Sequence, residues 1–277
     1  MNAPTTTSQN PSRPLLLRHN LKALRLPTML AEHEKLAREA AEAAEDYQGY
    51  LLRLSELELT TRAGNAIAHR IKLAGFPVIK ELADFDFGLA PTVNKPKVLE
   101  LCKPDWIDRH ETACLLGNSG TGKTHIAISI GLCAARAGKR VKFTTAAQLA
   151  NQLEEMQKKY QLERLLKSLE RVDLLIIDEL GYLSFSRTAA ELLFQVFADR
   201  YERASILVTS NLPFDEWVTV FQGERMTAAL LDRFTHRCTI LEMNGESYRF
   251  RESTGTSPKR QRAKDKITDG MEAKDAK

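Results

Sequence analysis

The stretch that decides the fold of this 277-residue chain is Gly117-Asn118-Ser119-Gly120-Thr121-Gly122-Lys123-Thr124, which directly follows a short apolar run at residues 112–116. It matches the pattern G-x-x-x-x-G-K-[ST] at every required position, and a helical pattern begins where it ends. The glycines let backbone N–H groups converge on a phosphate chain, and the following helix directs its positive end at the same charge. We expect Lys123 to contact the β and γ phosphates and the Thr124 hydroxyl to ligate Mg²⁺.

A pair of carboxylates ends the most apolar segment of the chain. Residues 174–177 are all Leu or Ile, and Asp178 and Glu179 follow them directly. Ligands bind at the carboxyl edge of the sheet in parallel α/β folds, and a buried strand that ends in two acids presents both of them there. We predict that Asp178 organises the Mg²⁺ shell and that Glu179 polarises an attacking water.

Two further polar positions are candidates for a role at the γ phosphate. Asn211 follows a third apolar run at residues 205–209. It either forms a turn or, if that run lies between the other two strands, orients water. Arg233 lies in a helical pattern with a basic end, at residues 228–237. It either neutralises the negative end of its own helix or reaches the γ phosphate of a neighbouring subunit as an arginine finger.

From residue 111 onward, short apolar runs alternate with helical segments. The expected strands are residues 112–116, 140–144, 173–177 and 205–209, and the expected helices are residues 123–137, 146–170 and 188–203. This alternation predicts an α/β fold in which helices cover both faces of a parallel sheet. The phosphate loop is followed by no N-K-x-D guanine-reading segment, and the chain has no L-S-G-G-Q-like stretch, which favours an adenine nucleotide.

The rest of the chain divides by composition. Apolar residues recur at helical spacing over residues 26–54 and again over residues 67–74, which predicts an all-helical N-terminal domain. Three prolines and little periodicity predict a linker before the sheet. The predicted parts are a disordered leader at residues 1–14, the helical domain at 15–87, the linker at 88–110, the nucleotide-binding domain at 111–250 and a disordered basic tail at 251–277.

Composition excludes several classes of protein. Hydrophobic residues make up 43% of the chain and charged residues 27%, which is typical of a folded globular protein. The longest strongly apolar run is far shorter than the roughly 20 residues of a membrane helix, and residues 15–17 are too few for a secretory signal. The four cysteines form no C-x-x-C pair, so a cytoplasmic protein with free thiols is expected. The net charge is +4, with basic residues in excess from Arg249 to the end.

Several motifs together resemble those of the IstB-like transposition helper ATPases, AAA+ proteins similar to the DnaC helicase loaders. The resemblance covers residues 21–248, and its segments are LRLPTM at 24–29, FPVIK at 76–80, DFDF at 84–87, the phosphate loop through His125, DELGY at 178–182, TSNLPF at 209–214, EW at 216–217 and LDR at 231–233. This set is far more specific than a phosphate loop alone.

The resemblance implies a fold, ligands and partners. It implies an AAA+ P-loop core with strand order 5-1-4-3-2, ATP and Mg²⁺ as ligands, and a homo-oligomeric ring or spiral on duplex DNA with a transposase as partner. It also implies that Asp178 helps hold the nucleotide and that Glu179 and Asn211 act in hydrolysis. Arg233 is then the finger, with Arg237 as a rival. In these proteins a helical insertion after the second strand faces DNA, and its candidate contacts here are Lys158, Lys159, Arg164 and Lys167.

The function expected from these motifs is a Mg²⁺-dependent ATPase that oligomerises on duplex DNA and assists a transposase in preparing target DNA. One alternative is a helicase loader whose helical N-terminus grips a replicative helicase. Another is a small-molecule kinase, which would turn over as a monomer without Arg233. The basic candidates on the insertion can equally form a solvated helix face, and Phe85 and Phe87 pack either near the adenine or in the core.

Overall fold

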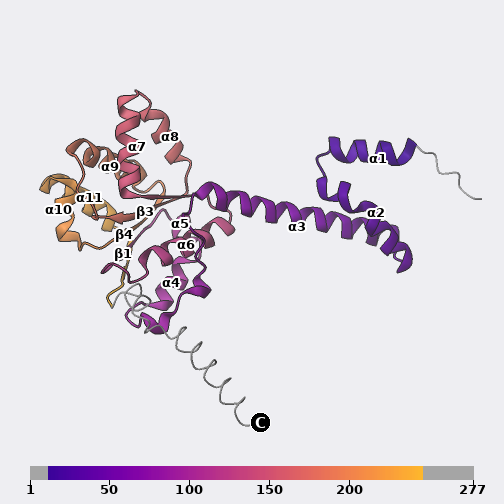
Figure 1. The fold of residues 1–277 in the computed structure, drawn as a ribbon, viewed down its shortest axis with the longest axis horizontal. Helices are drawn as coiled ribbons and strands as arrows, with labels where there is room; N and C mark the ends of the chain where they lie inside the picture. The colour runs from indigo at the N-terminus through magenta and orange to yellow at the C-terminus, as the bar shows by residue number, and fades with distance from the viewer. Residues whose placement is uncertain (1–11, 246–277) are drawn as a thin grey trace, which may run out of the picture. The chain divides into compact units, whose positions relative to one another are not determined.

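The computed structural model describes residues 12–245, and the chain separates into two compact units, Met1–His69 and Arg70–Lys277 (Figure 1). The predicted basic tail at residues 251–277 lies outside the described residues, as does most of the predicted leader. Residues 12–14 of that leader belong instead to the first helix, so this part of the prediction is wrong. No helix between residues 12 and 245 is long and apolar enough to cross a membrane.

The first unit is made of helices: α1 (Ser12–Ala23), α2 (Pro27–Glu42) and α3 (Tyr47–Ala74), the last of which continues past the boundary of the unit. The buried carboxylate of Glu58 on α3 accepts hydrogen bonds from the backbone N–H groups of Thr28 and Met29 at 2.8 and 3.0 Å. Those N–H groups lie in the first turn of α2 and have no partner within that helix. Glu58 therefore caps α2 and fixes it to α3.

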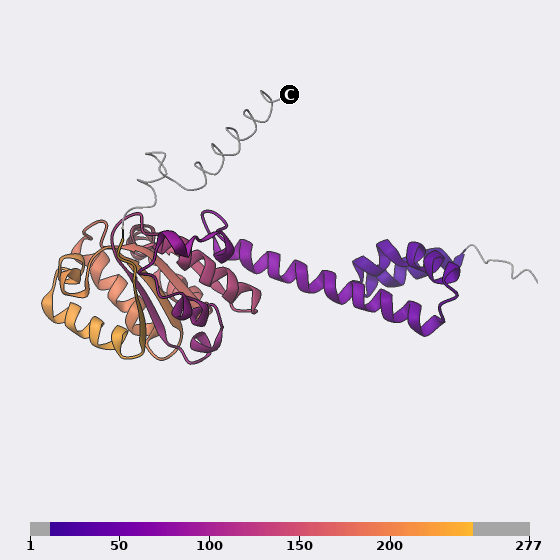
Figure 2. The same ribbon diagram turned by 90° about the horizontal axis from the view of Figure 1, so that it is seen from below.

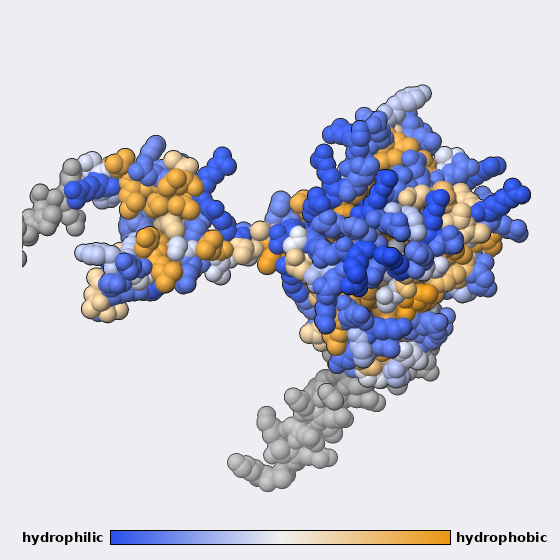
Figure 3. Space-filling view, turned by 180° about the vertical axis from the view of Figure 1, so that it is seen from behind, coloured by the Kyte–Doolittle hydropathy of each residue, from blue (hydrophilic) through white to orange (hydrophobic). Residues whose placement is uncertain are grey.

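The first unit also exposes large apolar side chains. They include Leu15 of α1 and Leu24 directly after it, which are 70% and 67% exposed, and Leu59 of α3, which is also 67% exposed. Patches of apolar surface on this unit are visible in Figure 3. Exposed apolar patches are typical of surfaces that contact another molecule.

The boundaries of the helices in the first unit differ from those that the apolar spacing predicts. Residues 26–54 do not form one helix, because the chain turns between α2 and α3, where Ala44 has a φ of +51°. The Asp46 carboxylate then accepts a hydrogen bond from the Gly49 N–H at 2.7 Å and caps α3, which also contains the second predicted helical stretch. Apolar residues keep their spacing across this turn, so periodicity alone does not reveal it.

The second unit is built on a five-stranded sheet. Its strands are β1 (Thr112–Leu116), β2 (Val141–Thr145), β3 (Leu174–Leu180), β4 (Ser205–Ser210) and β5 (Cys238–Glu242). All neighbours are parallel, and the order is β2-β3-β4-β1-β5. Read from the other edge, this is the order 5-1-4-3-2, so the expected fold class and strand order are confirmed. β3 continues past the predicted end to Leu180 and therefore includes both carboxylates.

Helices cover both faces of this sheet (Figures 1 and 2). One layer contains α7 (Ala146–Lys158), α8 (Leu162–Glu170), α9 (Arg187–Arg200), α10 (Trp217–Phe221) and α11 (Glu224–Thr235), and the other contains α4 (Lys95–Leu101), α5 (Asp105–Asp108) and α6 (Lys123–Arg136). Side chains alternate along a strand, so Cys114 packs in the first layer and Ala113 and Leu115 pack in the second. Burial on both faces explains why residues 174–177 are uniformly apolar.

The predicted linker at residues 88–110 is wrong, because this segment is part of the folded second unit. Its buried residues are Val93, Val98, Leu101, Trp106 and Ile107, which pack in the layer that contains α6. Two of its three prolines lie at the start of short helices, with Pro96 in the first turn of α4 and Pro104 directly before α5. These helices are too short to show a repeat in the sequence. The predicted helical domain also extends too far, since residues 70–87 belong to the second unit.

One buried arginine joins three segments at the amino-terminal edge of the sheet. Arg200, at the end of α9, is 4% exposed, and its guanidinium donates to the carbonyls of Leu169, Val172 and Ser205 at 2.8, 3.0 and 2.8 Å. Burial lowers the pKa of Arg200 to about 10, so the side chain stays charged at neutral pH. Without the guanidinium, the backbone carbonyls of Leu169 in α8, Val172 before β3 and Ser205 in β4 would each lose a hydrogen-bond donor.

Replacing Arg200 by Ala should lower the free energy of unfolding by about 2–4 kcal/mol, because buried carbonyls lose their donor and a cavity opens. Urea unfolding followed by circular dichroism measures the change. The exposed Arg203→Ala is the control, and it should change stability by no more than about 0.5 kcal/mol. A loss below about 1 kcal/mol for Arg200→Ala would mean that water replaces the guanidinium without penalty.

Candidate functional site

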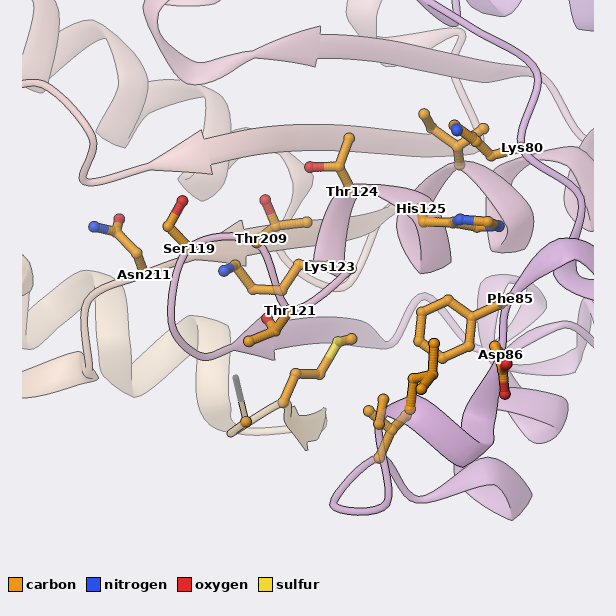
Figure 4. Close-up of a pocket in the computed structure, with 18 of the residues that line it drawn as sticks. Lys80, Phe85, Asp86, Ser119, Thr121, Lys123, Thr124, His125, Thr209 and Asn211 are labelled. Atoms are coloured by element: carbon orange, nitrogen blue, oxygen red, sulfur yellow. The ribbon is translucent and has the colours of Figure 1, made fainter. Parts of the chain in front are cut away.

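A cavity of about 600 Å³ lies where the carboxyl ends of β1, β3 and β4 meet. Figure 4 shows side chains that line it, and they come from the phosphate loop, from the end of β4 and from the segment before the sheet. Small-molecule sites usually enclose roughly 300–1,000 Å³, so a nucleotide fits by size. Of the octapeptide, residues 119–124 line the cavity, whereas Gly117 and Asn118 do not.

The phosphate loop is packed so closely that two of its glycines cannot be replaced. Gly117 has a φ of +147°, and a Cβ there would lie 2.1 Å from the carbonyl oxygen of Met243. Gly122 has a φ of +94°, and a Cβ there would lie 2.6 Å from the Phe85 ring. The loop backbone is therefore held between the end of the sheet and the segment that precedes it.

The amino-terminal end of α6 faces this loop. Its N-cap is Gly122, which offers no side chain to the first N–H groups, so the helix presents its positive end there. The Lys123 ammonium donates to the carbonyls of Gly117 and Asn118 at 2.6 and 2.7 Å. The arrangement of backbone N–H groups and one ammonium fits a phosphate chain.

Asp178 is held behind the cavity by two hydroxyl groups. Its side chain is buried, and its Oδ1 accepts hydrogen bonds from Thr209 Oγ1 at 2.5 Å and from Thr124 Oγ1 at 3.1 Å. Burial raises the pKa of Asp178 above its ordinary value of 3.8, although these hydroxyls and the nearby Lys123 oppose the rise. A hydroxyl and a carboxylate in contact are oxygen ligands of the kind that Mg²⁺ prefers.

Glu179 and Asn211 both line the cavity, and both are predicted to act on the attacking water. Glu179 is exposed although its neighbours in β3 are buried, and Asn211 follows β4 directly. Figure 4 shows Asn211 near Ser119 at one end of the group of labelled side chains. The site therefore brings together the loop and both of these candidates, as their positions at strand ends imply.

The other end of the cavity is aromatic. Phe85 lines it and makes edge-to-face contacts with Phe87 and His125, with ring centroids 4.8 and 5.3 Å apart. His125 Nε2 hydrogen bonds the Glu81 carbonyl at 2.8 Å, which ties α6 to the segment before the sheet. Both Phe85 and Phe87 pack against the core, and of the two Phe85 alone lines the cavity.

Several lining residues have no role predicted from the sequence, and two of them directly contact other residues of the site. They are His125, which directly follows the phosphate loop, and Thr209, the first polar residue after three apolar positions in β4. A polar residue directly after the apolar run of a strand is the sequence feature that could have indicated a role for Thr209.

Neither candidate finger belongs to the cavity of its own chain. Arg233 is exposed on α11, with its guanidinium 5.8 Å from the centroid of the Phe194 ring. Arg237 is also exposed, and its backbone carbonyl accepts a hydrogen bond from Thr112 at the amino end of β1. Neither arginine lines the cavity, so the finger role predicted for them is not supported within one chain.

The candidate DNA contacts lie on the surface of α7 and α8. The helix predicted over residues 146–170 is interrupted at Tyr160, which has a φ of +56°. All four basic residues, Lys158, Lys159, Arg164 and Lys167, are exposed, and none lines the cavity. Lys159 and Lys167 form ion pairs with Glu155 and Glu163 at 2.5 and 2.6 Å. Their charge is therefore partly neutralised within the same helices.

Asp178→Asn should raise the melting temperature of the nucleotide-free protein at pH 7 by about 2–4 °C. Because the folded pKa lies above 3.8, ionisation in the folded state opposes stability once the pH exceeds that value. The difference between variant and wild type should therefore shrink as the pH is lowered towards 4, which scanning calorimetry measures. The exposed Asp215→Asn is the control. A lower melting temperature for Asp178→Asn at pH 7 would contradict this account.

Residues 19–256 match the family of IstB-like ATP binding proteins. The chain is 40% identical over 229 residues to the ATP-binding protein of insertion sequence IS5376 of Geobacillus stearothermophilus, which covers 83% of this chain and 91% of that protein. It is 37% identical over 239 residues to the ATP-binding protein of insertion sequence IS21 of Pseudomonas aeruginosa, which covers 84% of this chain and 90% of that protein.

A solved structure resembles part of this chain. DnaA from Aquifex aeolicus, in its AMPPCP-bound form, has a TM-score of 0.53 at 22% identity and covers 64% of this chain and 54% of that chain. This likeness supports the AAA+ fold alone. The family match spans most of the sequence, and the relatives align over most of their own length. The chain therefore belongs to the family of IstB-like ATP-binding proteins.

Proposed function

We propose that this protein is a Mg²⁺-dependent ATPase that oligomerises on duplex DNA and assists a transposase in preparing target DNA. The observation that carries the proposal is the cavity that joins the phosphate loop to Glu179 and, through the Thr124 hydroxyl, to Asp178. Its relatives are named as ATP-binding proteins of insertion sequences, which supports a role in transposition rather than in helicase loading.

Mg²⁺ would be held by Thr124 and Asp178 together with phosphate oxygens and water. Within residues 12–245 no group of three or more His, Cys, Asp or Glu side chains could form a metal cage. Mg²⁺ commonly binds through one or two protein oxygens plus substrate phosphates, which suits the pair found here. The ion would neutralise charge on the phosphate oxygens.

Residues in and around the phosphate loop would bind the phosphates and position the attacking water. Lys123 binds the β and γ phosphates, because its ammonium already lies against the loop carbonyls. Glu179 accepts a proton from the attacking water, and Asn211 orients that water, since both line the same cavity. Removal of bulk water by the aromatic end of the cavity would strengthen these polar contacts.

A second copy of the chain would complete the site. The exposed positions of Arg233 and Arg237 outside the cavity suit a finger supplied to a neighbour. Binding of ATP between two copies then favours assembly, because the nucleotide contacts both of them. The apolar surface of the first unit suits contact with another protein, either another copy or the transposase.

Duplex DNA would contact the surface of α7 and α8. Lys158 and Arg164 are the better candidates, because no acidic side chain pairs with them among the described residues. Lys159 and Lys167 would first have to leave Glu155 and Glu163. Phosphate contacts of this kind are independent of base sequence and weaken as salt increases.

The proposal predicts that the protein retains duplex DNA in gel-shift experiments with Mg²⁺ and ATP but not without nucleotide. Lys123→Ala should abolish this retention and weaken ATP binding by about 100-fold in calorimetry, because it removes a charged phosphate contact. The exposed Lys103→Ala, which lies outside the cavity, is the control. Equal retention of DNA by the wild type with and without ATP would contradict the proposed switch.

A mixing experiment tests the finger. Lys123→Ala and Arg233→Ala proteins should each release little phosphate alone and regain turnover when mixed, because neighbours then combine an intact Lys123 with an intact Arg233. Phosphate release is measured over a series of mixing ratios. Full turnover by Arg233→Ala alone would exclude it as the finger, and the same mixing series with Arg237→Ala would then test its rival.

A further inference from the structure

The pairing of β3 and β4 is interrupted at the acidic pair. Ile177 pairs with Val208, and the next pair along the strands is Leu180 with Ser210. Two residues of β3, Asp178 and Glu179, therefore lie opposite one residue of β4, which is Thr209. This two-against-one arrangement is a β-bulge, a feature that redirects side chains and is common beside active sites.

The bulge turns the two carboxylates in different directions. Glu179 has a φ of +61°, a backbone conformation that residues other than glycine rarely adopt. As a result, Asp178 is buried beside Thr124, whereas Glu179 is exposed at the cavity. Neighbouring side chains of a regular strand also point to opposite faces of the sheet. Both faces of this sheet are covered by helices, so in a regular strand the Glu179 side chain would be buried under a helix layer and would not reach the cavity.

One hydroxyl group forms hydrogen bonds with both residues of the bulge. Thr209 is 1% exposed, and its Oγ1 accepts a hydrogen bond from the Glu179 N–H at 2.9 Å. The same hydroxyl donates to Asp178 Oδ1 at 2.5 Å. A threonine hydroxyl has one proton to donate and lone pairs to accept, so both bonds form at once. The Glu179 N–H, which loses its strand partner at the bulge, thereby gains another.

We infer that Thr209 is a positioning residue that sets the direction of both carboxylates. It fixes the backbone from which Glu179 reaches the water, and it fixes the oxygen of Asp178 that also contacts Thr124. Figure 4 shows Thr209 among the side chains that line the cavity. This inference rests on the proposed ATPase function, because it assigns no substrate of its own.

The test compares Thr209→Val with Thr209→Ser. Valine has nearly the same shape and suits a strand but lacks the hydroxyl, whereas serine keeps it. Thr209→Val should lower kcat by at least about tenfold and change the KM for ATP by less than about threefold, since the loop and Lys123 are untouched. Thr209→Ser should recover most of kcat. The control is Thr144→Val, which removes a buried hydroxyl from β2 outside the cavity and should leave kcat unchanged.

A binding measurement gives a readout that does not depend on turnover. ATP binding by calorimetry in EDTA should be equal for Thr209→Val and wild type, whereas the added affinity given by Mg²⁺ should be smaller for the variant. Wild-type kcat and Mg²⁺ dependence in Thr209→Val would overturn the inference, as would a loss in Thr209→Ser as large as in Thr209→Val. If the wild type binds no ATP, the proposed function fails instead, so the two failures are distinguishable.

Discussion

The contact between the Thr124 hydroxyl and the Asp178 carboxylate joins the two halves of the site. Thr124 lies in the first turn of α6, and Asp178 lies in β3, 54 residues further along the chain. The contact depends on the strand order, since β4 lies between β1 and β3 and brings their carboxyl ends into one row. A phosphate chain in the loop and a cation beside it can therefore share the same edge of the sheet. Without this order the loop would bind an anion but offer no second oxygen to a metal.

The burial of the Asp178 carboxylate opposes the stability of the protein, and the hydrogen bond from Thr124 offsets only part of this effect. Burial raises the pKa of Asp178, so keeping this carboxylate ionised at neutral pH requires free energy that other parts of the fold supply. Glu179 adds to this requirement through its positive φ. Uniform burial of residues 174–177 on both faces of the sheet offsets these local penalties. Binding sites that keep a charged group buried before the ligand arrives commonly lower the stability of the protein.

The position of the arginines links the chemistry to assembly. On the proposed mechanism, the cavity of one chain is lined by the loop, Glu179 and Asn211, and no arginine among the described residues lines it to stabilise charge at the γ phosphate. Arg233 lies outside it, beside Phe194. On the same proposal, a site divided in this way would turn over only when two copies meet, which would make hydrolysis dependent on assembly.

The sequence by itself determined the phosphate loop, the acidic pair, the parallel sheet and its flanking helices, because each of these depends on neighbouring residues and on short repeats. It did not determine that residues 88–110 are folded, because their helices are stabilised by burial against α6 and not by any repeat of their own. It also did not determine the bulge at Asp178 and Glu179 or the part of Thr209 in it. Those features depend on hydrogen bonds between β3 and β4, whose partners are about 30 residues apart in the chain, and only the tertiary structure brings them together.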